Sequence, residues 1–149
     1  MARAAIGDRA EIALTVATDD VEIADHARAV GCDAVMTDSA IATGSGRALA
    51  AALAQPVAPR FVINLQGDSP FQPRGALGSV IAALEAGAQV ATPVIALDWP
   101  ALDALRDHKT RSPFSGTTCA RAPDGHAYWF SKAIIPAIRN EDSLRATLP

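Results

Sequence analysis

Runs of apolar residues and stretches with helical spacing alternate along the first half of the chain. Three elements are expected at its start, a strand, a helix and a second strand, at residues 11–18, 19–31 and 33–37. The short carboxylates of Asp19 and Asp20 suit the N-cap of this helix, and Gly31 suits its end. This order predicts a β-α-β unit with two parallel strands.

The alternation continues through the middle of the chain. A helix, a strand, a helix and a strand are expected at residues 47–55, 61–65, 74–87 and 89–97. The first of these strands is strongly apolar and is expected to be buried. Together the elements predict an α/β fold with a doubly wound, mostly parallel sheet and helices on both faces. Ligands bind at the carboxyl edge of such sheets, where Asp19 and Asp68 would both follow a strand.

The last third of the chain is less regular. A helix, a strand, a turn and a second strand are expected near residues 99–108, 117–121, 122–125 and 126–130. Three aromatic residues, Tyr128, Trp129 and Phe130, follow one another in the last strand, so their side chains would alternate between its faces. Packing in a core is favoured over a stacking platform for these rings. Residues 1–149 are expected to form one domain.

Composition narrows the classes of function. The 149 residues include 13 Lys and Arg against 16 Asp and Glu, and no basic run is present, which argues against a nucleic-acid partner. No apolar stretch reaches the roughly 18 residues of a membrane span, and the first residues lack the apolar core of a secretory signal. Cys32 and Cys119 have neither metal-ligand spacing nor the density of a disulfide scaffold. A cytoplasmic protein with reduced thiols and no membrane contact is expected.

The sequence NLQGD contains the strongest candidate for a functional site. The expected strand delivers Gln66, Gly67 and Asp68 into a loop that Pro70 closes. A glycine lets the backbone approach a ligand closely, and an aspartate is a hard oxygen donor for Mg²⁺ that is shared with substrate phosphates. The alternative is a simple turn in which Asp68 bonds to nearby backbone amides.

Two further segments carry candidate binding residues. In the ATGSGR loop, backbone amides and the hydroxyls of Thr43 and Ser45 can bind an anion or the edge of a base, and Arg47 can neutralise a phosphate. A plain helix cap is the alternative. In the sequence VATDD, Thr18 and Asp19 either cap the following helix or contact a nucleotide.

In this order, the segments VATDD, DAVMT, TGSGR, VINLQGD with SPF, and YWFSKAIIP resemble the CMP-Kdo synthetase family. The resemblance extends from about Ile12 to Asn140. It implies a three-layer nucleotidyltransferase fold and a reaction in which the anomeric hydroxyl of Kdo attacks the α-phosphate of CTP, so that CMP is transferred and pyrophosphate leaves. It also implies a requirement for Mg²⁺, a role in lipopolysaccharide synthesis and the formation of a homodimer.

The resemblance assigns roles to individual residues. Asp68 would be the catalytic residue and the metal ligand. The residues that bind the nucleotide would be Ala17, Thr18, Asp19, Thr43, Gly44, Ser45, Arg47, Gln66 and Gly67. Catalysis would then consist mainly of positioning and charge neutralisation, without a nucleophilic side chain.

The chain also departs from the family pattern. The family has a triphosphate-binding loop before the position of Glu11, and a sugar-binding segment with a second metal-binding aspartate after SKAIIP. A fragment with weak or no activity alone is therefore expected. Ile41 stands where the family often has histidine, and Gly46 stands where it usually has an acid. The alternative functions are a non-catalytic nucleotide-binding remnant and a cytidylyltransferase for another acid sugar.

Overall fold

The computed structural model describes residue 6, residues 9–69, residue 73 and residues 75–147. The chain divides into two compact units, residues 1–93 and residues 94–149. The expectation that the whole chain forms one domain stays a prediction. Within the described residues, no helix combines the length and the apolar character that a membrane span requires.

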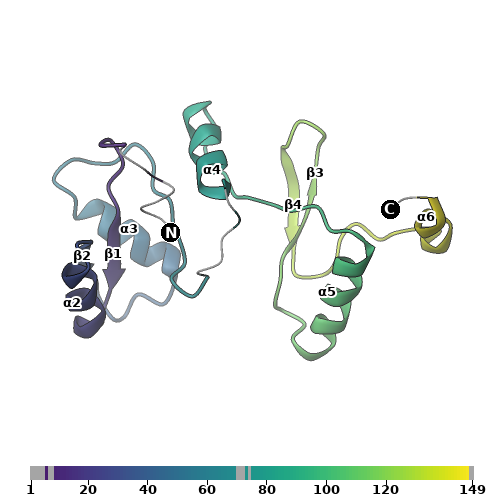
Figure 1. Cartoon of the computed structure of the whole chain (residues 1–149), viewed down its shortest axis with the longest axis horizontal. Helices are drawn as coiled ribbons and strands as arrows, with labels where there is room; N and C mark the ends of the chain where they lie inside the picture. Colours follow the sequence, from purple (N-terminus) through teal and green to yellow (C-terminus); the bar gives the residue numbers. More distant parts are fainter. Residues whose placement is uncertain (1–5, 7–8, 70–72, 74, 148–149) are drawn as a thin grey trace. The chain divides into compact units, whose positions relative to one another are not determined.

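The described part of the first unit contains two parallel strands, two helices that pack on them and a further helix (Figure 1). Its elements are β1 (Thr15–Thr18), α2 (Val21–Ala29), β2 (Asp33–Met36), α3 (Gly44–Leu53) and α4 (Ala76–Glu85). β1 pairs with β2 in register, from Thr15 opposite Asp33 to Thr18 opposite Met36. Because α2 packs against both strands and α3 packs against β1, the predicted β-α-β unit and the α/β class are confirmed.

Short polar side chains begin the two helices that cover this strand pair. The Asp20 carboxylate accepts hydrogen bonds from the backbone N–H groups of Glu22 at 2.8 Å and Ile23 at 3.2 Å. Of the two candidate aspartates it is therefore Asp20 that caps α2. The Thr43 hydroxyl accepts a hydrogen bond from the N–H of Gly46 at 3.1 Å and caps α3 in the same way.

α4 confirms the third expected helix of this unit. It buries Ile81 and Leu84, and it ends before Gly87, whose φ of 105° lies in the left-handed region that favours glycine. The start that the sequence predicts for this helix, Arg74, lies outside the described residues.

The expected strands at residues 61–65 and 89–97 are not formed, and these two predictions are wrong. Val62 is 47% exposed and Ile95 is 73% exposed, so the expected burial of the first strand is wrong as well. An apolar run becomes a strand only where a neighbouring strand pairs with its backbone N–H and C=O groups. In the described part of the chain neither segment has such a neighbour.

The described part of the second unit contains two helices and an antiparallel strand pair. Its elements are α5 (Trp99–Arg111), β3 (Thr118–Arg121), β4 (Ala127–Ser131) and α6 (Glu141–Thr147). β3 pairs with β4 from Thr118 opposite Ser131, with an irregularity between Ala120 and Arg121. The expected helix and hairpin are therefore confirmed. The sequence pattern did not predict α6, since this helix buries none of its side chains.

Three aromatic side chains of β4 do not pack in a core. Tyr128, Trp129 and Phe130 are 74%, 64% and 45% exposed, so the prediction of core packing is wrong. The strand pair of this unit has only two strands, which leaves the outer edge of β4 and much of both its faces open to solvent.

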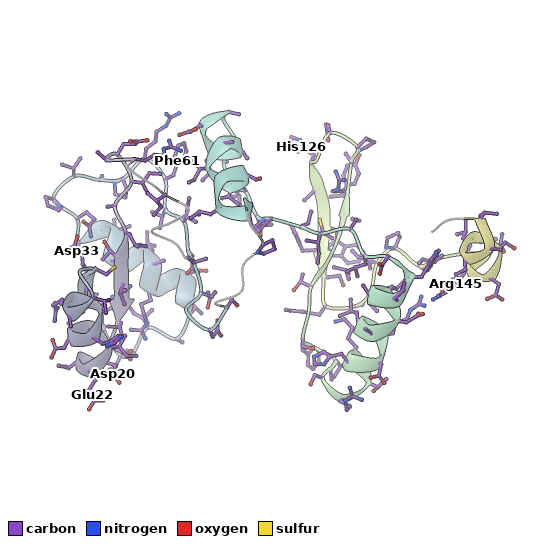
Figure 2. All side chains as sticks on the ribbon, in the orientation of Figure 1. Asp20, Glu22, Asp33, Phe61, His126 and Arg145 are labelled. Atoms are coloured by element: carbon purple, nitrogen blue, oxygen red, sulfur yellow. The ribbon has the colours of Figure 1, made fainter. Side chains whose placement is uncertain are left out.

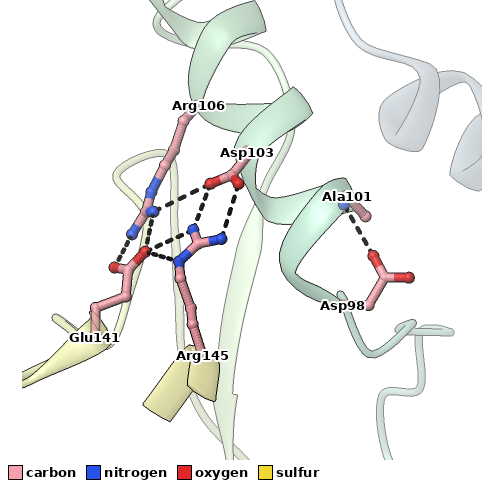
Figure 3. Close-up of polar contacts among 6 residues, drawn as sticks. All are labelled: Asp98, Ala101, Asp103, Arg106, Glu141 and Arg145. Carbon is pink, nitrogen blue, oxygen red and sulfur yellow. Dashed lines mark hydrogen bonds and ion pairs between the residues drawn. The ribbon is translucent and has the colours of Figure 1, made fainter. Parts of the chain in front are cut away.

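Charged side chains connect α6 to α5 (Figure 3). Glu141 accepts two hydrogen bonds from Arg106, both of 2.7 Å, and Arg145 donates to Asp103 at 2.6 and 2.9 Å. Arg145 also donates to Glu141 and lies 4.6 Å from the centre of the Trp99 ring. Hydrogen bonds from Arg106 and Arg145 lower the pKa of Glu141 from 4.5 to about 2.

Candidate functional site

The VATDD and DAVMT segments, which contain the ends of β1 and β2, meet at the carboxyl edge of this strand pair. The backbone N–H of Thr37 donates to the carbonyl of Thr18 at 2.8 Å, so the chain leaves both strands side by side. Asp19 follows β1 at this edge. In Figure 2, Asp20 lies at the same edge and Asp33 lies at the opposite end of the strand pair. Ligands of α/β proteins bind at the carboxyl edge.

Arg47, in the first turn of α3, contacts three groups of the protein. Its guanidinium donates to the Thr37 hydroxyl and, at 3.2 Å, to the carbonyl of Ile41. The same guanidinium lies 3.2 Å from the Asp19 carboxylate, and the Arg47 side chain is only 19% exposed. Arg47 thereby connects the ends of both strands, and the loop that precedes α3, to the start of that helix.

The NLQGD segment lies against the N-terminal turn of α3. The Gln66 carboxamide covers Gly44 so closely that a Cβ atom at position 44 would lie 2.7 Å from Gln66 Nε2. The Asn64 side chain donates to the Ser45 hydroxyl at 3.4 Å. Glycine at position 44 therefore permits a close approach of Gln66 that any larger residue would prevent.

Gly67 and Asp68 occupy the centre of an exposed turn. The N–H of Ser69 donates to the carbonyl of Gln66 at 3.2 Å, which closes the turn. A Cβ atom at Gly67 would meet nothing within 4 Å, so in this structure no protein group requires glycine there. Pro70, which the sequence predicts to close the loop, lies outside the described residues.

Asp68, the residue expected to hold a metal, offers one exposed carboxylate. Within the described residues, no group of three or more His, Cys, Asp or Glu side chains is gathered as a metal site. Mg²⁺ is commonly held by one or two carboxylates, substrate phosphates and water. A single aspartate therefore fits a Mg²⁺ ion that arrives with a nucleotide triphosphate.

The residues at the end of β1 differ in their local roles. Thr18 is buried, and its hydroxyl accepts a hydrogen bond from the N–H of Asp20 at 3.1 Å. Ala17 is half-buried within the strand. Capping of α2 belongs to Asp20, which leaves Asp19 as the partner of Arg47.

Two residues of this junction, Thr37 and Asn64, carry contacts that the sequence analysis did not predict. Asn64 precedes Gln66 by two positions, a spacing that places side chains on one side of an extended segment. That spacing is the signal that could have identified Asn64. Nothing comparable marks Thr37, because its role depends on the approach of Arg47 from another element.

The two departures from the family pattern lie next to each other. A Cβ atom at Gly46 would lie 3.1 Å from Cγ2 of Ile41 and 3.0 Å from the Thr43 hydroxyl oxygen. A side chain at position 46 would therefore press on both the Ile41 side chain and the N-cap of α3. The apolar residue at 41 and the glycine at 46 form one packing arrangement.

An apolar groove of about 180 Å³ lies elsewhere on this unit. It is bordered by the C-terminal half of α3, through Leu49 and Leu53, and by Ala58 and Val62. None of the predicted site residues lines it. The groove offers little to a charged nucleotide, because its lining is mostly apolar and contains no charged side chain.

Three contacts therefore bring the predicted segments together. Arg47 joins the ends of β1 and β2, Gln66 covers Gly44, and Asn64 reaches Ser45. The resulting surface contains two carboxamides, two hydroxyls and the amides of a helix N-terminus. Such groups can hydrogen-bond a base, a sugar or a phosphate.

Comparison with known proteins agrees with these motifs. The sequence profile described as cytidylyltransferase matches residues 3–148. The chain is 40% identical over 131 residues to a 3-deoxy-manno-octulosonate cytidylyltransferase of Maricaulis maris, covering 87% of the chain and 51% of that relative. It is 38% identical to the enzyme of the same name from Anaeromyxobacter dehalogenans, covering 83% of the chain and 47% of that relative.

A Rickettsia felis protein of the same name is 33% identical, and the match covers 81% of the chain and 47% of that relative. The chain thus spans about half the length of the curated relatives it matches. No solved structure matches it significantly. Since the family profile covers almost the whole sequence, the chain belongs to the cytidylyltransferase family.

Proposed function

We propose that the chain binds CTP with Mg²⁺ and contributes to the transfer of CMP to Kdo. In this reaction the anomeric hydroxyl oxygen of Kdo forms a bond to the α-phosphorus of CTP, the bond to the β-phosphate oxygen breaks, and pyrophosphate leaves. The hydroxyl proton passes to solvent or to a basic group. The relatives named 3-deoxy-manno-octulosonate cytidylyltransferase support the choice of Kdo.

The observation that carries the proposal is the convergence of VATDD, TGSGR and NLQGD at one edge of the first unit. These segments lie up to about fifty positions apart in the sequence, yet Arg47 contacts Asp19, and Gln66 covers Gly44. If each segment only capped its own helix, contacts between the segments would not be required. Their meeting at the carboxyl edge of a parallel strand pair supports a common ligand.

The proposed roles follow the chemistry of each residue. The nucleotide-binding residues are Ala17, Thr18, Asp19, Thr43, Gly44, Ser45, Arg47, Gln66 and Gly67. The Gln66 carboxamide and the Ser45 hydroxyl supply neutral hydrogen bonds. Asp68 would hold the Mg²⁺ ion, which neutralises phosphate charge when bound. Catalysis then depends on positioning and electrostatics, and the chain needs no nucleophilic side chain.

The finer expectations remain part of the proposal. We infer that the β1–β2 pair belongs to a doubly wound, three-layer sheet of the nucleotidyltransferase type. The confirmed β-α-β unit supports this inference. The proposal also includes a cytoplasmic location, a role in lipopolysaccharide synthesis and a homodimer, as the resemblance to the CMP-Kdo synthetase family implies.

Titration calorimetry of the 149-residue chain with CTP tests the proposal, with Mg²⁺ present and with Mg²⁺ removed by chelation. We expect CTP binding that is tighter with Mg²⁺, and we expect Asp68→Asn to abolish the gain from Mg²⁺. Asp33→Asn is the matched control, because Asp33 is an exposed aspartate at the amino end of β2, away from the site. A chain that does not bind CTP would refute the proposal.

Measurement of pyrophosphate release then tests which acid sugar accepts CMP. Only weak release from CTP with Kdo, and none with a sialic acid, is the expected pattern, in line with the weak activity expected of this chain alone. Release with the sialic acid alone would favour a cytidylyltransferase for another acid sugar. Binding of CTP without release in either case would favour a nucleotide-binding module.

A further inference from the structure

We infer that Arg47 is a positioning residue, which shapes the nucleotide pocket through Thr37, Asp19 and the Ile41 carbonyl and does not itself hold a phosphate. The inference rests on the proposed function. It changes the role of Arg47 from a direct ligand of the triphosphate to a support of the segments around it.

The contacts of the guanidinium carry this inference. A guanidinium has five N–H groups in a rigid planar fork. In Arg47, one terminal nitrogen donates to the Thr37 hydroxyl and forms an ion pair with Asp19, and the other donates to the Ile41 carbonyl. With 19% of the side chain exposed, the charged end faces protein groups rather than the open edge of the site.

The local charge balance points the same way. The Asp19 carboxylate, 3.2 Å from the guanidinium, neutralises the positive charge of Arg47. A phosphate that approached Arg47 would have to displace Asp19 or share the guanidinium with it, and the two anions would repel each other. Arg47 is therefore poorly placed as a phosphate ligand and well placed to hold its three protein contacts.

The three contacts define what Arg47 positions. Thr37 follows β2, Asp19 follows β1, and Ile41 belongs to the loop that leads into α3. Arg47 itself lies on the turn of α3 whose first residue, Gly44, receives Gln66. Loss of the guanidinium would free the loop and the two strand ends to move relative to the start of α3. Every group that faces the ligand would then lose its placement, whichever part of the nucleotide it contacts.

A series of ligands with different numbers of phosphates separates positioning from phosphate binding. Calorimetry of the whole chain with cytidine, CMP and CTP, the last with Mg²⁺, is carried out for the unsubstituted protein and for Arg47→Gln. We expect Arg47→Gln to weaken the binding of all three ligands by a similar factor of about tenfold, which is the typical effect of one charge-assisted contact. A phosphate ligand would leave cytidine binding unchanged and would weaken CTP most.

Two further variants sharpen the test. Arg47→Lys keeps the charge but not the planar fork, so a positioning role predicts little recovery, whereas a phosphate contact predicts substantial recovery of CTP binding. Thr37→Val removes the acceptor of Arg47 at nearly constant volume, at a residue outside the predicted binding set. Thr37→Val should reproduce part of the loss of ligand affinity. In a chain that already carries Arg47→Gln, it should cause no additional loss. If Arg47→Gln does not fold, as judged by circular dichroism, Thr37→Val alone carries the test.

The possible outcomes distinguish a positioning role of Arg47 from phosphate binding. Equal losses across cytidine, CMP and CTP, without recovery by lysine, support the positioning role. Losses that grow with the number of phosphates and recover with lysine, or full CTP affinity in Thr37→Val, overturn this role and leave the proposed function intact. A wild-type chain that binds none of the ligands overturns the proposed function, and the role of Arg47 falls with it.

Discussion

Replacing Gly44 by alanine would separate the stability of α3 from the placement of Gln66. Gly44 is the first residue of α3, and its φ lies outside the left-handed region, so its backbone accepts an alanine. The new Cβ atom would lie 2.7 Å from Gln66 Nε2, closer than real contacts allow. Since Gln66 is exposed and its carboxamide is the end of a flexible side chain, the carboxamide would move and the helix would stay.

The expected magnitudes have opposite signs. Alanine in place of glycine stabilises the interior of a helix by about 1 kcal/mol and the first helical position by less, so the Tm of a chain of this size should rise by at most about 2–4 °C. Loss of one neutral hydrogen bond from Gln66 to the nucleotide lowers binding by about 1 kcal/mol, or about fivefold in Kd. Gly44→Ala should therefore give a protein that is more stable and binds CTP more weakly.

Thermal unfolding followed by circular dichroism and calorimetry with Mg²⁺ and CTP measure the two effects. Gly78→Ala is the matched control, because Gly78 lies in α4 and a Cβ atom there would meet nothing within 4 Å. It should raise stability and leave CTP binding unchanged. In a Gln66→Ala background, Gly44→Ala should no longer weaken CTP binding. Unchanged CTP affinity in Gly44→Ala, or a lower Tm, would refute the reasoning.

Other predictions concern the stability of each unit. Asp20→Ala should lower the free energy of unfolding by about 1 kcal/mol, since it removes the N-cap of α2, whereas Asp25→Ala on the exposed face of α2 should change it little in urea titrations. Gly116→Ala should destabilise the second unit by about 1–2 kcal/mol in the same titrations, because φ is +63° and the Cβ atom would lie 3.0 Å from Leu105 Cδ1. The pKa of Glu141 is lowered from 4.5 to about 2, so its stabilising contacts are fully present above pH 4.5 and are lost as the pH falls toward 2. The protection factors of the α6 amides, corrected for intrinsic exchange at each pH, should therefore fall over that range, and Glu141→Gln should reduce this pH dependence; protection factors that do not change with pH in the unsubstituted protein would contradict this.

Local signals identified most of the secondary structure. The caps, the helical spacing and the terminal glycines predicted α2, α3, α4 and α5, and the turn at residues 122–125 predicted the β3–β4 pair. These features act over a few residues, so the sequence contains the information directly. α6 escaped prediction because ion pairs with α5, which are distant in sequence, hold it in place.

The predicted site was only partly visible in the sequence. Its segments were identified by their motifs, yet two contacts that organise it, from Thr37 and Asn64, were not. Nothing in the sequence around Thr37 indicates that an arginine of another element will donate to its hydroxyl. The roles of the nucleotide-binding residues and of Asp68 stay predictions until CTP binding is measured.

The sequence by itself determined the existence and approximate position of α2, α3, α4 and α5, because capping and helical spacing are local. It also determined the family, through five ordered segments. The tertiary structure alone decided which apolar segments become strands, since residues 61–65 and 89–97 have strand-like composition but no pairing neighbour in the described chain. It also decided that Arg47 faces Asp19 and Thr37, because the direction of a long charged side chain depends on which acceptors the fold brings within its reach.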